Sequence, residues 1–185
     1  EKEVPEIYNG IVEIKAIARD AGDRTKMAVL SHNPDIDPIG ACIGPRGNRV
    51  QNIIDELNGE KVDIFEYSND VSVLVKNALA PAVVTAVLPG RDDNSLLVIV
   101  DAAQLSLAIG KRGKNARLAV KLTNHKIDIK TREEIEEAGM DYEALLAQAE
   151  VLKQKAAEKT AKENEMKRAE AIKEQEEKKA AAAEK

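Results

Sequence analysis

The order of apolar and polar positions predicts one set of elements, which then recurs along the chain. In the first half, period-two alternation predicts strands over 12–18, 25–30 and 62–65, with a turn at 20–23 between the first two. A short apolar run over 39–43 and a helical spacing from Val50 to Leu57 predict two helices before the last strand. Asp37 is the expected N-cap of the first helix, and Gly59 is the expected C-cap of the second.

The second half follows the same plan. The pattern predicts a helix over 70–79 ended by Pro81, strands over 83–88 and 96–100, and a short helix over 102–109. A helix containing Leu118 and Leu122 and a strand at 127–129 complete the set. When the two halves are compared, Pro5 corresponds to Pro81, and residues 1–8 match only the end of the helix predicted over 70–79. We therefore expect the first unit to lack the beginning of that helix.

The composition changes to Glu, Lys and Ala after residue 130. Thr131 and Glu134 predict a capping box, Gly139 predicts a break, and Asp141 is the expected cap of a helix reaching residue 152. The apolar spacing then fails, although Glu–Lys pairs four residues apart, such as 158–162, 163–167 and 174–178, favour a helix. We expect a solvated, partly helical tail over 153–185, with a coiled coil as the alternative.

In both halves the short helix runs into a Gly-X-X-Gly turn, and the turns at 44–47 and 110–113 are 66 residues apart. Glycines without a Cβ let another backbone come close, and the helix that follows presents unpaired N–H groups and a positive dipole end. Basic residues flank both turns, which predicts binding of a phosphate chain. The candidate RNA-binding residues are Gly44, Pro45, Arg46, Gly47, Arg49, Gly110, Lys111, Arg112, Gly113, Lys114, Asn115, Arg117 and Lys121.

The distribution of charge supports this interpretation better than its total. The net charge is −5, yet no acidic residue lies between Asp101 and Asp128, where Lys and Arg supply six positive charges. Exposed charges act over only about 10 Å at 0.1 M salt, so a phosphate chain would meet the local cluster. Only 2% of the residues are aromatic, so an aliphatic groove beside each turn would have to hold the bases. The first unit has fewer basic residues, and we expect it to be the weaker half.

The sequence lacks the residues that several classes of function require. Gly47 and Gly113 are not followed by the Lys-Ser/Thr of a nucleotide-binding loop, and His32 and His125 are isolated, so we expect no enzyme, metal site or cofactor. The single cysteine, Cys42, excludes an internal disulfide and favours the cytoplasm. No apolar run approaches the roughly 18 residues of a membrane span. We expect a monomer without membrane contact.

Five segments carry a resemblance to a known family. They are Val4-Pro5-Glu6-Ile7, residues 37–44, Arg46-Gly47-Asn48-Arg49-Val50, Ala108-Ile109-Gly110-Lys111 and Asn115-Ala116-Arg117-Leu118-Ala119. Together they resemble tandem KH domains of type II, or bacterial, topology, and more closely the KH pair of the NusA family of bacterial transcription factors.

The resemblance implies an α+β fold of two KH domains, each a three-stranded sheet with helices on one face, followed by a charged tail that is helical or disordered. We expect the domains at 1–67, with its first helix truncated, and 68–131, then short helices over 132–152.

The same resemblance implies a factor that binds nascent single-stranded RNA and acts on transcription elongation, termination and antitermination. In that family an RNA-polymerase-binding domain and an OB-fold domain precede the KH pair, so contact with RNA polymerase is expected through domains outside this sequence. The alternative is a protein-interaction module in which degenerate KH folds hold no RNA. The basic stretch over 111–121 argues against that alternative.

Overall fold

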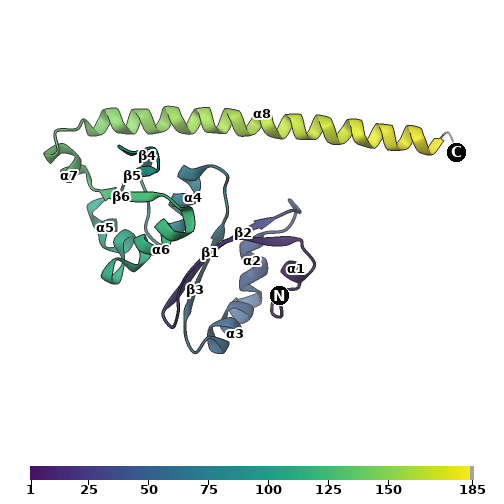
Figure 1. Cartoon of the computed structure of the whole chain (residues 1–185), viewed down its shortest axis with the longest axis horizontal. Helices are drawn as coiled ribbons and strands as arrows, with labels where there is room; N and C mark the ends of the chain where they lie inside the picture. Colours follow the sequence, from purple (N-terminus) through teal and green to yellow (C-terminus); the bar gives the residue numbers. More distant parts are fainter. Residues whose placement is uncertain (184–185) are drawn as a thin grey trace. The chain divides into compact units, whose positions relative to one another are not determined.

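The computed structural model describes the backbone of residues 1–183 and the side chains of residues 1–162, 165 and 166. Residues 1–142 form one compact unit, and a second unit begins at Glu143. The first unit contains two successive sets of helices and strands, which we call the first domain (α1 to β3) and the second domain (α4 to β6) (Figure 1).

The first domain is a three-stranded sheet in the order β1-β2-β3, with β1 antiparallel and β3 parallel to the central strand. The parallel pairing requires a crossover, and the two helices predicted between the strands supply it. The elements are α1 (Pro5–Tyr8), β1 (Val12–Asp20), β2 (Arg24–Ser31), α2 (Pro38–Ile43), a 3₁₀ turn η1 (Pro45–Gly47), α3 (Asn48–Glu56) and β3 (Lys61–Glu66).

The second domain repeats this topology in the order β4-β5-β6, again with one antiparallel and one parallel pair. The predicted α+β class with two tandem domains is therefore confirmed. The elements are α4 (Val71–Ala78), β4 (Ala86–Pro89), β5 (Ser95–Ile99), α5 (Ala102–Ile109), a 3₁₀ turn η2 (Lys111–Gly113), α6 (Lys114–Thr123) and β6 (Lys126–Lys130).

Capping residues fix most of the helix starts that the sequence predicts. The Asp37 carboxylate accepts a hydrogen bond from the N–H of Ile39 at 3.0 Å, and Pro38 occupies the first position of α2. Thr131 and Glu134 form the predicted capping box at the start of α7 (Arg132–Glu137). The last helix, α8 (Tyr142–Ala183), begins directly after Asp141.

Three local predictions are wrong. Pro5 begins α1 instead of ending a helix, because a proline at the first helical position loses no hydrogen bond. It therefore has no equivalence to Pro81, which follows the end of α4. Strand β4 begins at Ala86 and not at residue 83, since the N–H of Val83 donates to the side chain of Gln104 at 3.0 Å.

The end of one helix also differs from the prediction. Helix α3 ends at Glu56, and Asn58 takes a left-handed conformation ahead of Gly59, as Asn124 does after α6. Helix α8 runs to Ala183, so the described backbone of the tail is helical, which is one of the two forms expected for it. The charge pairs predicted at 163–167 and 174–178 lie outside the described side chains.

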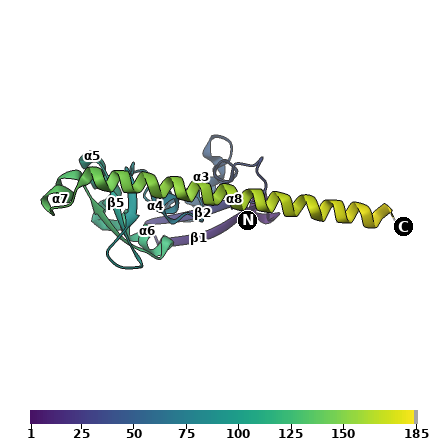
Figure 2. The same ribbon diagram turned by 90° about the horizontal axis from the view of Figure 1, so that it is seen from above.

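The first sheet buries residues on both of its faces. On one face Val12, Val29 and Cys42 form a core with α1 and α2. On the other face Ala28 and Phe65 belong to a core that continues into the second domain. Strand β1 runs past α6 in both views (Figures 1 and 2), in agreement with the contacts between these two elements. The two domains therefore share one core.

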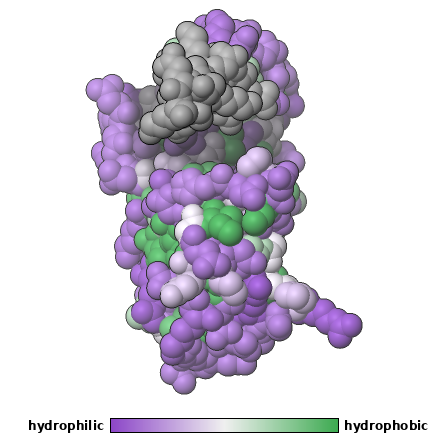
Figure 3. Space-filling view, turned by 90° about the vertical axis from the view of Figure 1, so that its right-hand side faces the viewer, coloured by the Kyte–Doolittle hydropathy of each residue, from purple (hydrophilic) through white to green (hydrophobic). Residues whose placement is uncertain are grey.

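The surface agrees with a chain that carries many charges. On the face shown in Figure 3, hydrophilic residues predominate and hydrophobic ones form small areas between them. Within the described part of the chain, no helix is long and apolar enough to span a membrane.

Candidate nucleic-acid interface

The two Gly-X-X-Gly turns have nearly the same backbone. The first residues, Gly44 and Gly110, have φ/ψ of 74°/173° and 75°/168°. The third, Arg46 and Arg112, are left-handed with φ of 55° and 56°. In each turn the N–H of the last glycine donates to the carbonyl of the first at 3.0 Å. We call residues 44–47 the first glycine turn and residues 110–113 the second glycine turn.

The two glycines of each turn have different roles. A Cβ on Gly110 would lie 2.7 Å from the Cβ of Asn115 and 2.9 Å from its backbone nitrogen, so packing against α6 requires a glycine there. A Cβ on Gly44 would lie 2.5 Å from the Cγ of Arg49. By contrast, Gly47 has nothing within 4 Å of that position, and Gly113 has only an arginine tip at 3.9 Å. The outer surface at the second glycine of each turn is therefore open to an approaching chain.

Arg49 and Asn115 occupy equivalent positions, and both side chains hold the helices around the turn. The Arg49 guanidinium donates to the carbonyl of Ala41 at 2.6 Å and to the carboxylate of Glu6 at 2.9 Å. The Asn115 side chain is 1% exposed and donates to the carbonyl of Leu107, which is the counterpart of Ala41, at 3.2 Å.

Asn115 also donates to the carbonyls of Leu79 and Ala108, at 2.9 and 3.1 Å. The structure thus places these two predicted RNA ligands where their side chains shape the turn and face the protein.

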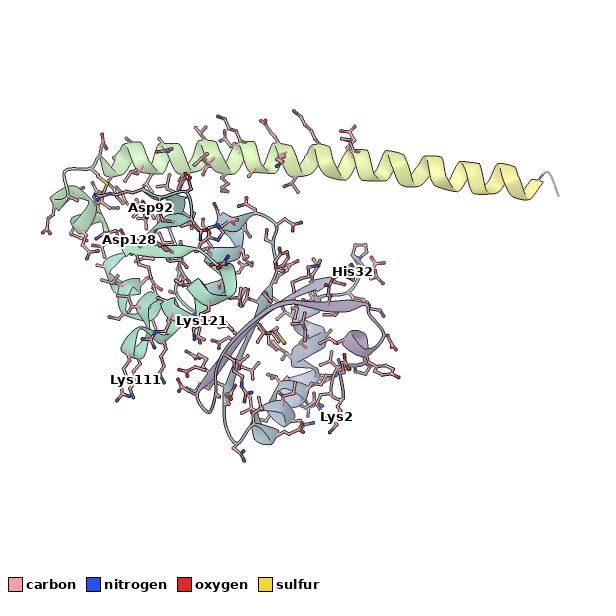
Figure 4. The ribbon with its side chains drawn as sticks, viewed as in Figure 1. Lys2, His32, Asp92, Lys111, Lys121 and Asp128 are labelled. Carbon is pink, nitrogen blue, oxygen red and sulfur yellow. The ribbon has the colours of Figure 1, made fainter. Side chains whose placement is uncertain are left out.

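Most of the other predicted residues of the second turn are exposed. Lys111, Arg112, Arg117 and Lys121 have exposed side chains, and Arg117 donates to the carbonyl of Arg112 at 3.1 Å, which ties α6 to the turn. Figure 4 shows Lys111 at the opposite end of the second domain from Asp92. The exposed basic side chains at the second turn therefore lie away from Asp92, which pairs with Lys126 at 3.5 Å.

Lys114 differs from its neighbours because it already has acidic partners. Its Nζ forms an ion pair with Asp23 and lies 4.0 Å from the carboxylate of Asp20, in the turn between β1 and β2. The hydrogen bond from Lys114 lowers the pKa of Asp23. We call residues 20–23 the acidic turn. It joins the first domain to the second directly beside the second glycine turn.

A buried carboxylate holds the acidic turn in place. Glu60 is 1% exposed and accepts hydrogen bonds from the side chains of Arg19 and Thr25 and from the N–H of Gly22. These bonds, led by those from Arg19, lower the pKa of Glu60 from 4.5 to about 2. Glu60 thus stays ionised and fixes the conformation from which Asp23 reaches Lys114.

The first glycine turn carries less charge. Pro45 and Arg46 are exposed, but position 48 holds an asparagine where the second turn has Lys114. With Arg49 engaged by Glu6, Arg46 is the one predicted cation of this turn that extends from its surface. The first glycine turn should therefore attract phosphate less strongly than the second.

Apolar side chains lie next to both turns. Ile43 and Ile109, which precede the two turns at equivalent positions, are 36% and 40% exposed, and Leu107 is 47% exposed. These aliphatic surfaces adjoin the basic residues, as a groove for bases beside a phosphate contact requires.

Arg24 and Lys61 were not predicted as site residues. They begin β2 and β3, stand opposite each other in the parallel register, and line a pocket with the second glycine turn. The pocket has a volume of about 250 Å³, and its lining residues are Asp23, Arg24, Lys61, Gly110, Lys111, Arg112, Lys114 and Asn115. Only the strand pairing and the packing of the two domains bring these residues together, so no local pattern in the sequence marks them.

Other candidate chemistry is sparse. Among the described residues, no three His, Cys, Asp or Glu side chains are grouped to hold a metal ion. His32 contacts Glu13 at 2.9 Å, His125 contacts the carbonyl of Thr123 at 2.7 Å, and Cys42 is buried. These residues have structural or surface positions, as predicted.

The repeated topology and the paired turns define a tandem of type II KH domains. Two family models match the chain: the NusA-like first KH domain over residues 1–67 and the NusA-like second KH domain over residues 71–137. The chain belongs to the NusA family.

Curated relatives agree with this assignment. The transcription termination/antitermination protein NusA of Halalkalibacterium halodurans is 56% identical over 140 residues, which are 76% of this chain and 37% of the relative. The NusA of Bacillus subtilis is 54% identical over 140 residues, covering 76% and 38%. The NusA of Thermus thermophilus is 51% identical over 149 residues, covering 80% and 38%. The chain thus spans little more than a third of the length of these relatives.

A solved structure supports the fold. The crystal structure of APE1850 superimposes with a TM-score of 0.50 and 24% sequence identity, covering 70% of this chain and 96% of that one. At this identity the likeness concerns the fold alone.

Proposed function

We propose that this chain binds single-stranded RNA through its two glycine turns, as the KH portion of a factor for transcription termination and antitermination. The observation that carries the proposal is the pair of matching turns, each with an open outer glycine and exposed basic side chains. Membership of a family whose curated relatives are named as termination/antitermination proteins supports the transcriptional role.

Some of the predicted residues would contact RNA directly, and others would position the turns. Lys111, Arg112, Arg117 and Lys121 supply charge to the second turn, while Arg46 supplies it to the first, so that phosphate contacts are concentrated in the second domain. The open surfaces at Gly47 and Gly113 let the RNA backbone come close to the turns. Arg49 and Asn115 act by positioning, since their side chains bind neighbouring carbonyls.

The wider role follows from the family. We propose domain limits of 1–67 and 68–131, a monomeric state, and action on nascent RNA in the cytoplasm, without enzymatic activity of its own. Contact with RNA polymerase would be made by other parts of the whole protein.

A binding titration tests the proposal. A fluorescein-labelled single-stranded RNA of mixed sequence is titrated with the wild-type chain and with a variant in which Lys111→Asp and Arg112→Asp convert the second turn to Gly-Asp-Asp-Gly. We expect the variant to lose at least about tenfold in affinity and to show a smaller salt slope, because two cations near the phosphates become anions.

The same change in the first turn, Pro45→Asp with Arg46→Asp, is the matched control for position. We expect a smaller loss there, since that turn contributes fewer charges. An unchanged affinity and salt slope in the second-turn variant would contradict the proposal and favour a protein-interaction module.

A further inference from the structure

The pocket between the domains has the composition of an anion site. Two cations from the first domain, Arg24 and Lys61, face Lys111, Arg112 and Lys114 from the second, and Asp23 is the acidic residue among the lining side chains. We call this space the interdomain pocket. Its walls place five positive charges around one carboxylate, so its lining retains a net positive charge.

The carboxylate of Asp23 occupies the position of an anion within this pocket. It forms the ion pair with Lys114, whose backbone directly follows Gly113 at the start of α6. A phosphate that approached the open side of the second glycine turn would meet the same ammonium group. Asp23 therefore competes with a phosphate for Lys114, and it does so from the neighbouring domain.

The two cations of the first domain differ in how they are held. The Nε of Arg24 lies 3.2 Å from the carboxylate of Asp63, which fixes the guanidinium at the pocket wall. Lys61 has an exposed side chain and belongs to the strand that starts beside the acidic turn, where its own N–H donates to the carbonyl of Asp23 at 3.0 Å. Arg24 is thus held by Asp63, and Lys61 is held through its backbone. Both residues line the pocket together with the second glycine turn.

We infer that the interdomain pocket binds a phosphate of the RNA that lies on the second glycine turn, with Lys61 and Arg24 of the first domain as additional ligands. Asp23 acts as an internal anion that holds Lys114 until RNA replaces it. This inference rests on the proposed function and assigns RNA contacts to residues outside both glycine turns. It makes the second site dependent on the first domain.

Two substitutions with opposite expected effects test this inference in the full chain. Lys61→Gln should weaken binding of the fluorescein-labelled single-stranded RNA several-fold and reduce the salt slope by about 0.7, the value for one phosphate contact with a single strand. Asp23→Asn should strengthen binding several-fold, because Lys114 loses its closer acidic partner and keeps only Asp20 at 4.0 Å, while no cation is removed. Lys2→Gln is the matched control, since Lys2 is an exposed lysine of the first domain and lies far from Lys111 in Figure 4.

Lysine footprinting of the wild-type chain provides a readout that needs no variant. RNA should protect Lys61 from acetylation as strongly as Lys111 and leave Lys2 reactive.

The outcomes separate the two proposals. If the wild-type chain does not bind the RNA, the proposed function fails, and this inference fails with it. If the wild type binds and the Gly-Asp-Asp-Gly variant does not, while Lys61→Gln matches the control and Lys61 stays reactive, the inference is overturned and the proposed function stands.

Discussion

Lys114 of the second domain and Asp23 of the first form an ion pair next to the second glycine turn. The side chains are 28% and 44% exposed, so water and salt reach the pair. The pair therefore contributes more to the placement of the acidic turn beside the second glycine turn than to the free energy of unfolding. It also links the residues that we propose contact RNA to the packing of the two domains.

A double-mutant cycle measures this link through stability. Lys114→Gln, Asp23→Asn and the double variant are unfolded with urea at low salt and at about 1 M salt, where the screening length is about 3 Å. We expect a favourable coupling at low salt that falls at high salt. A coupling that is absent at low salt would show that the pair does not form in solution.

Glu60 gives the stability a defined dependence on pH. Its pKa is about 2 in the folded chain and 4.5 ordinarily. Between these values the unfolded chain binds the proton more tightly, so acidification favours unfolding, and the stabilisation is lost as the pH falls through this range. We expect the melting temperature to drop more steeply below about pH 5 in the wild type than in Glu60→Gln. Parallel curves for the two proteins would contradict this assignment.

The two glycines of the second turn should respond differently to alanine. Gly113→Ala should cost about 1 kcal/mol, the left-handed backbone penalty of a residue with a Cβ. Gly110→Ala adds a clash with the backbone of Asn115 and should cost about 2–4 kcal/mol. Gly44→Ala should fall between them, since its close neighbours include the side-chain Cγ and Cδ of Arg49 and no backbone atom. Urea unfolding of the three variants checks this order, and equal costs would refute it.

Asn115→Ala should destabilise the second domain without removing a charge. The carbonyls of Leu79, Leu107 and Ala108 lose the two N–H donors that they share. An unsatisfied buried group costs about 1–3 kcal/mol, so we expect a loss of about 2–4 kcal/mol after relaxation. Asn52→Ala serves as the control, because Asn52 is exposed and its side chain donates to the carboxylate of Glu3 at 2.9 Å. A loss below about 1 kcal/mol in urea unfolding would mean that water replaces the amide.

Phe65→Ala tests whether the shared core couples the domains. Phe65 is 6% exposed and belongs to the core that includes Val75 and Ala78 of α4. Truncation should cost about 3–5 kcal/mol. Hydrogen exchange should rise together in β2 and in α6 if the domains unfold as one unit. A rise confined to the first domain would show that they unfold separately.

The local features of this fold were predictable from the sequence. The apolar spacing predicts the strands and most helices, Asp37 and Thr131 predict helix starts, and the repeated glycines predict both turns. Each of these depends on residues within a few positions of one another, which is the range over which capping and turn chemistry act.

The sequence was less informative about contacts between distant positions. Arg49 has the composition of a phosphate ligand, but Glu6 and the carbonyl of Ala41 take its guanidinium. Arg24 and Lys61 reach the second turn only through strand pairing and domain packing. The direction of a long side chain depends on neighbours that the local sequence does not specify.

The core shared by the two domains has a consequence for the length of RNA that we propose they contact together. Because Phe65 and Ala28 pack in one core with α4, the separation of the two glycine turns is set by the protein. A strand that contacts both turns must then span a fixed distance with a fixed number of nucleotides. We expect an extra nucleotide inserted between the two contacted segments to be looped out, so the chain would select its RNA by the spacing of those segments.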